Sequence, residues 1–156
     1  MANIESSKVS FGGDMMIFVS ASGTTYPIAF STDAKLDITV NTREISSKDS
    51  TGSFTEHAAG KISWTASSDA LYSYELSSGT TRNSFDELYS LMISRQAVKF
   101  AFAKTSGSTP NWTVDSSEKS YTGEVIITGV SINAPNDEST TFSISLKGNG
   151  ALTQSA

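Results

Sequence analysis

Leu36-Asp37-Ile38-Thr39-Val40-Asn41 and Lys61-Ile62-Ser63-Trp64-Thr65-Ala66 alternate apolar and polar residues without a break. Successive side chains of a β-strand point to opposite faces, so this period of two predicts two strands that each bury one face. We expect the strands to pair with each other. The pair then presents an apolar face to a core and leaves a second, polar face on the other side.

The same alternation recurs along the chain and predicts a mainly β fold. It appears in the ranges 14–19, 26–31, 98–103, 121–133 and 142–147. One segment, at about 84–95, has a helical pattern instead. Ser84-Phe85-Asp86-Glu87 is a capping box, and Phe85, Leu88, Leu91 and Met92 share one helical face. The segment 104–120 is rich in Ser and Gly and predicts an exposed loop. We expect residues 1–156 to form one domain.

The segment of about 42–60 separates the first two strands and is too long for an ordinary hairpin turn, which takes two to five residues. It therefore predicts a long hairpin arm that either extends the strands beyond the body or hangs as a flexible loop. Both possibilities direct it towards a partner. The residues expected to make contacts between subunits are Arg43, Glu44, Ser47, Lys48, Asp49, Ser50, Phe54 and Glu56.

The composition argues against most catalytic and ligand-binding chemistry. With a net charge of −5 and no cysteine, the chain is unsuited to gripping phosphates and can form neither disulfides nor thiolate sites. His57 is the single histidine and has no second histidine for a metal site. Ser116 and Lys119 match a serine–lysine spacing that a chain so rich in serine produces by chance. We therefore expect no enzyme activity, no metal and no cofactor.

The first ten residues are polar and contain no basic segment followed by an apolar one. This predicts synthesis in a cytosol and no membrane insertion. The predicted strands leave polar faces and open edges, which carry few of the lysines and prolines that usually protect an edge. A ring of identical subunits would pair each edge with that of a neighbour.

Several stretches, in order, resemble the major tail tube proteins of siphophages, in particular the TP901-1-like group. They are Gly13-Asp14-Met15-Met16-Ile17-Phe18-Val19, Ile28-Ala29-Phe30-Ser31-Thr32-Asp33-Ala34-Lys35-Leu36-Asp37-Ile38, Glu44-Ile45-Ser46-Ser47-Lys48-Asp49-Ser50, Gly60-Lys61-Ile62-Ser63-Trp64 and the ending Phe142-Ser143-Ile144-Ser145-Leu146-Lys147-Gly148-Asn149-Gly150-Ala151-Leu152. The resemblance covers nearly the whole chain.

The resemblance implies a β-sandwich or barrel-like tail tube fold with one flanking helix. It further implies hexameric rings that stack into a hollow tube in the virion tail and conduct the genome from capsid to host cell. The implied partners are other copies of the chain, the tape measure, tail terminator and baseplate proteins, and double-stranded DNA in transit. Two alternatives remain: the inner tube of a contractile tail or a related secretion apparatus, and a secreted β-sandwich binding module.

Strand parity selects the residues that would face the channel. Leu36, Ile38 and Val40 are expected to point to the core, as are Phe142, Ile144 and Leu146. A slip of one residue would exchange the two faces completely, so the assignment applies to a whole strand at once. The opposite face then carries Asp37, Thr39, Asn41, Ser143 and Ser145, which we expect to form a weakly acidic channel wall that DNA can slide along.

Overall fold

The computed structural model describes residues 12–20, 26–28, 30–47, 52, 54–73, 83–108 and 111–155. A short 3-10 turn, Gly12–Asp14, leads into the first strand. The elements that follow are β1 (Met15–Ser20), β2 (Tyr26–Pro27), β3 (Ser31–Glu44), β4 (His57–Leu71), α1 (Phe85–Ile93), β5 (Val98–Ser108), β6 (Asn111–Val114), β7 (Ser120–Asn133) and β8 (Thr141–Ser155).

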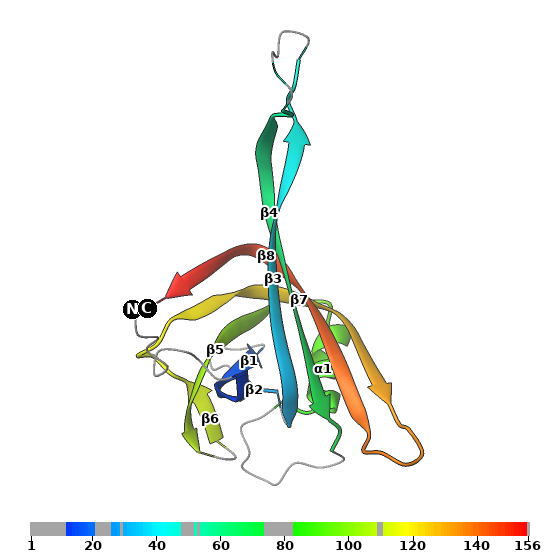
Figure 1. Cartoon of the computed structure of the whole chain (residues 1–156). Helices are drawn as coiled ribbons and strands as arrows, with labels where there is room; N and C mark the ends of the chain where they lie inside the picture. Colours follow the sequence, from blue (N-terminus) through cyan, green and yellow to red (C-terminus); the bar gives the residue numbers. More distant parts are fainter. Residues whose placement is uncertain are drawn as a thin grey trace, which may run out of the picture.

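The strands form one antiparallel sheet in the order β2-β1-β5-β7-β8-β4-β3, with β6 paired to β5 off this path. β1 contacts β3, although the two lie near opposite ends of the pairing order. The sheet therefore curls towards a barrel, with β3 and β4 crossing its front and projecting beyond it (Figure 1). The prediction of a mainly β, barrel-like fold with one helix is confirmed.

The core lies on the concave side of this sheet, where the helix also packs. Leu88 of α1 is fully buried in the same cluster as Phe142, Ile144 and Leu146 of β8. The capping box is present: the backbone N–H of Ser84 donates to the Glu87 carboxylate at 2.5 Å. The helix ends at Ile93, and Arg95 follows with a positive φ of 57°.

Several predicted boundaries differ from the structure. The strand expected at 26–31 ends at Pro27, and Phe30 has a positive φ of 54°. The segment expected as an exposed loop at 104–120 instead continues β5 to Ser108 and folds back as β6, pairing Thr105 with Val114. Backbone pairing between β5 and β6 forms this hairpin. The Ser- and Gly-rich composition of the segment does not predict it. The two strands of the arm also extend further than their apolar alternation, to Glu44 and from His57.

Candidate assembly surfaces

The sheet formed by β3, β4, β8 and β7 has one face turned away from the core. Cross-strand pairing fixes three rows of side chains on it, because directly paired residues share a face. The rows are Asp33-Asp69-Ser143-Ser131, Lys35-Ser67-Ser145-Gly129 and Asp37-Thr65-Lys147-Ile126. We call this surface the polar face. Its side chains are exposed, apart from the half-buried Ser67.

The structure places the residues predicted to line the channel as follows. Asp37, Ser143 and Ser145 lie on the polar face and are exposed. Thr39 extends the polar face further along β3. Its hydroxyl group forms a hydrogen bond with the hydroxyl group of Ser63 at 3.0 Å. Asn41 is also exposed but falls in an irregularity of the ladder, where the pairing shifts between Val40 and Thr42.

Sequence reasoning missed two basic side chains on this face. Lys35 lies in the row of Ser145 and forms an ion pair with Asp37 at 3.5 Å, while Lys147 lies in the row of Asp37 itself. The three rows therefore carry three aspartates and two lysines. The signal was available, since both lysines have the same strand parity as the predicted residues.

The long hairpin arm is formed by the outer halves of β3 and β4, which extend the pairing beyond the body (Figure 1). The last strand pair is Glu44 with His57, and the N–H of Ile45 then donates to the carbonyl oxygen of Glu56 at 2.9 Å. Of the two possibilities for residues 42–60, the extended strands are therefore the one that the structure adopts over its described part.

The side chains predicted for contacts between subunits are exposed on the arm wherever the structure describes them. These are Arg43, Glu44, Ser47, Phe54 and Glu56. Phe54 is 92% exposed. Lys48, Asp49 and Ser50 lie outside the described residues. On the face of the arm that continues the core, Ile38 and Ile62 are 51% and 66% exposed, so the arm offers apolar surface as well as charge.

The four-stranded unit β3-β4-β8-β7 has an open strand edge on each of its two outer sides in the described part of the chain. β3 pairs only with β4 and is the last strand of the sheet. β7 pairs with β5 through residues 121–125, so its second half, 126–133, pairs only with β8. Unpaired N–H and C=O groups along such edges are templates for another strand. The four-stranded unit β3-β4-β8-β7 is therefore bounded by one open edge on each side.

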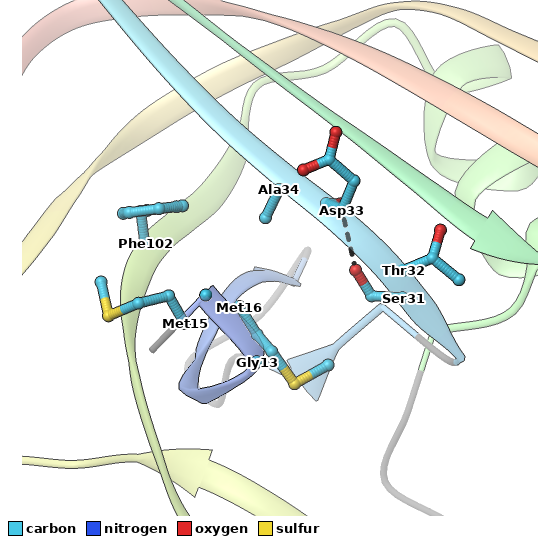
Figure 2. Close-up of a pocket in the computed structure, with 9 residues that line it drawn as sticks. Gly13, Met15, Met16, Ser31, Thr32, Asp33, Ala34 and Phe102 are labelled. Carbon is cyan, nitrogen blue, oxygen red and sulfur yellow. Dashed lines mark hydrogen bonds between the residues drawn. The ribbon is translucent and has the colours of Figure 1, made fainter. Parts of the chain in front are cut away.

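A cavity of about 460 Å³ lies where the curled sheet fails to close between β1 and β3 (Figure 2). Met15, Met16 and Phe102 form its apolar wall, and Ser31, Thr32 and Asp33 its polar wall. The Ser31 hydroxyl donates to the backbone oxygen of Asp33 at 3.2 Å. These groups include no pair of nucleophile and base, and we assign no chemistry to the cavity.

Neither a metal-binding cluster nor a membrane-spanning helix is found among the residues that the structure describes. Among them, no group of three or more His, Cys, Asp or Glu side chains is arranged to hold a metal ion. Within the same ranges, no helix has the length and apolar character needed to cross a membrane.

A four-stranded unit with an open edge on each outer side presents backbone groups to which further strands can pair. Comparison with known families then identifies the chain: the family model of the phage tail tube protein matches residues 10–154. The chain belongs to this family of structural proteins, and its place is the virion tail. This membership favours the tail tube function over the alternative of a secreted binding module. The family model does not distinguish the TP901-1-like group from other groups of the family.

Solved structures share this fold at low sequence identity. The first is the tail of an empty gene transfer agent particle, refined with C6 symmetry, with a TM-score of 0.75 and 16% identity over 95% of this chain and 100% of that one. The SPP1 tail tube follows with a TM-score of 0.66 and 10% identity, over 94% of this chain and 78% of that one. A search of curated proteins found no match.

Proposed function

We propose that six copies of this chain close into a ring and that rings stack into the tube that conducts the phage genome. The observation that carries the proposal is the pair of open edges on the unit β3-β4-β8-β7. The unit contains an even number of antiparallel strands, so β3 and β7 run in opposite directions. Rotation about a ring axis therefore brings β3 of one copy beside β7 of the next as an antiparallel pair. The six-fold symmetry of the gene transfer agent tail supports the copy number.

The polar face is the surface that we assign to the channel. The helix and core occupy the other side of the sheet, so the polar face can turn inwards with Ile126 as the one apolar side chain of its three rows. Six units of four strands, spaced about 4.8 Å apart, give a circumference of about 115 Å and a backbone diameter of about 37 Å before strand tilt widens it. Duplex DNA can pass through such a channel.

The mixed charge of the polar face suits a conduit. A basic wall would hold DNA at many phosphates, because duplex DNA carries one negative charge per about 1.7 Å. Here three aspartates outnumber two lysines, and hydroxyl groups fill most other positions. We infer a wall that binds DNA weakly and that counterions screen readily.

The arm is the element that we assign to stacking. It carries exposed charges, the exposed Phe54 and an apolar face with Ile38 and Ile62, and this combination suits contact with a neighbouring ring. The whole chain, 1–156, would act as one tail tube domain without enzymatic activity. Its further partners would be the tape measure, terminator and baseplate proteins that meet the tube along its length and at its ends.

Negative-stain microscopy of the concentrated protein tests the assembly directly. We expect six-fold rings or tubes, whereas a monomer at every concentration, with no tubes in virions that react with an antibody against the chain, would contradict the proposal.

Cysteine cross-linking tests the edge pairing, and the chain has no native cysteine to interfere. Ser131→Cys is combined in turn with Asp33→Cys, Lys35→Cys and Asp37→Cys. In one chain these positions are three strand spacings apart, about 14 Å, which exceeds the reach of a disulfide. Oxidised assemblies should give a ladder up to the hexamer for at least one pair. Ser67→Cys with Ser131→Cys, which uses the central strand β4, should give none.

A further inference from the structure

Strands β4 and β8 run side by side and then separate at one point. Their last pair is Thr65 with Lys147. Beyond it, β4 continues into the arm paired only with β3, and the end of β8 turns away paired only with β7 (Figure 1). Trp64 is the first arm residue past this point, and Gly148 is the residue that would face it if the pairing continued.

The Trp64 indole fills the separation point from the core side. The side chain is only 4% exposed and lies over Gly148, where an added Cβ would overlap the ring. It reaches on to Gly123 of β7, where a Cβ would lie 2.9 Å from the ring edge. Its ring meets that of Phe100 with centroids 5.2 Å apart. Two glycines thus leave room for one large side chain to span from the base of the arm to β5.

A hydrogen bond ties the indole to the strand that turns away. The Trp64 N–H donates to the carbonyl oxygen of Gly150 at 3.0 Å. Gly150 has a φ of +88°, a backbone conformation that favours glycine, and a Cβ added there would meet no other atom within 4 Å. The change in direction of β8 therefore depends on backbone freedom at Gly150, and the indole fixes where its carbonyl points.

We infer that Trp64 is a positioning residue that sets the angle of the arm relative to the body and, through it, the rotation between stacked rings. The inference rests on the proposed function, because the angle of the arm affects the assembly only where the arm contacts a stacked second copy. From Trp64 to His57 the arm spans about 23 Å at about 3.3 Å per residue. A tilt of about 10° at Trp64 would therefore move the end of β4 by about 4 Å, close to one strand spacing.

The test compares variants by the helical twist of their tubes, a quantity that a general loss of stability does not alter. Trp64→Phe keeps an aromatic ring but removes the N–H donor. Gly150→Val places a β-branched residue where φ is positive, whereas Gly150→Asn is the conservative partner because asparagine tolerates this region. Ile17→Val, a buried core residue of β1 away from the proposed subunit edges, serves as the control for core destabilisation. Each protein is examined by thermal melting as the monomer and by cryo-electron microscopy after assembly.

We expect Trp64→Phe and Gly150→Val to fold, and either to assemble with a twist changed by several degrees per ring or to assemble at least tenfold more slowly. Gly150→Asn should lie closer to the wild type, and Ile17→Val should keep the wild-type twist despite a lower Tm. Wild-type twist and assembly rate in both Trp64→Phe and Gly150→Val would overturn the inference. Should Trp64→Phe not fold, the two Gly150 variants decide the question. Failure of the wild-type protein to form tubes would instead contradict the proposed function.

Discussion

Asp33 and Asp69 lie directly opposite each other on β3 and β4, and both side chains are exposed on the polar face. Like charges in such a cross-strand position destabilise a sheet. The pair fits a surface that serves a channel, where negative charge keeps DNA from binding, rather than one selected for the stability of the isolated subunit.

Asp69→Asn should therefore stabilise the free subunit, by about 0.2–1 kcal/mol and most at low salt. Urea unfolding at two salt concentrations measures the effect. Asp37→Asn is the matched control, since Asp37 forms an ion pair with Lys35 and its neutralisation should leave stability unchanged or slightly lower it. A loss of stability in Asp69→Asn at low salt would show that the two carboxylates do not repel.

Adding positive charge to the polar face should slow genome passage without preventing assembly. The triple variant Asp37→Lys, Thr39→Lys and Ser143→Lys should form tubes but eject DNA more slowly, most severely at low salt, where phosphate contacts are strongest. Asp86→Lys, Tyr89→Lys and Gln96→Lys make the same net change at exposed positions in and just after the helix. This control should eject normally. Equal ejection rates of the two triple variants at every salt concentration would refute the channel assignment.

Shortening the arm should separate folding from stacking. Deletion of residues 47–53 keeps the bond between Ile45 and Glu56 that closes the described part of the hairpin. We expect a wild-type circular dichroism spectrum and single rings in place of tubes. The point variant Phe54→Ser should weaken stacking to a smaller extent, because it removes only one exposed apolar side chain. Normal tubes from the shortened protein would show that stacking does not use the arm.

The turn after β6 should respond to acid. The side-chain and backbone hydrogen bonds from Ser117, with a smaller contribution from Lys104, hold the pKa of Asp115 below its usual value of 3.8. A lowered pKa in the folded state means that the carboxylate stabilises the turn above about pH 4 and that this stabilisation is lost as the pH falls through the folded pKa. The Ser117 amide should then exchange faster with solvent. In Asp115→Asn, the Ser117 amide should be unprotected both above about pH 4 and at the lower pH. A protection of this amide in the wild type that does not change with pH would contradict the role of Asp115.

Much of this architecture could be predicted because local patterns and tertiary packing agree. The capping box at Ser84 and the alternation around Ile38 and Ile144 report backbone geometry directly, and the predicted helix start and strands are confirmed. The expected burial of Ile38 and Val40 is wrong, because β3 has left the body for the arm there and the two side chains are 51% and 47% exposed. The hairpin of β5 and β6 could not be predicted in this way, since its pairing involves a Ser- and Gly-rich segment with no apolar alternation. The role of Trp64 depends on glycines of two other strands, and only the sheet order brings these together.

In the proposed assembly, the polar face lines the channel of a ring closed by β3 and β7. A cryo-electron microscopy map of the assembled tube, at a resolution that separates strands, tests it most directly. We expect six copies per ring, with Asp37 and Ser145 pointing to the axis, α1 on the outside and β3 of each copy paired with residues 126–133 of its neighbour. A map with α1 facing the axis, or with β3 unpaired between subunits, would contradict it.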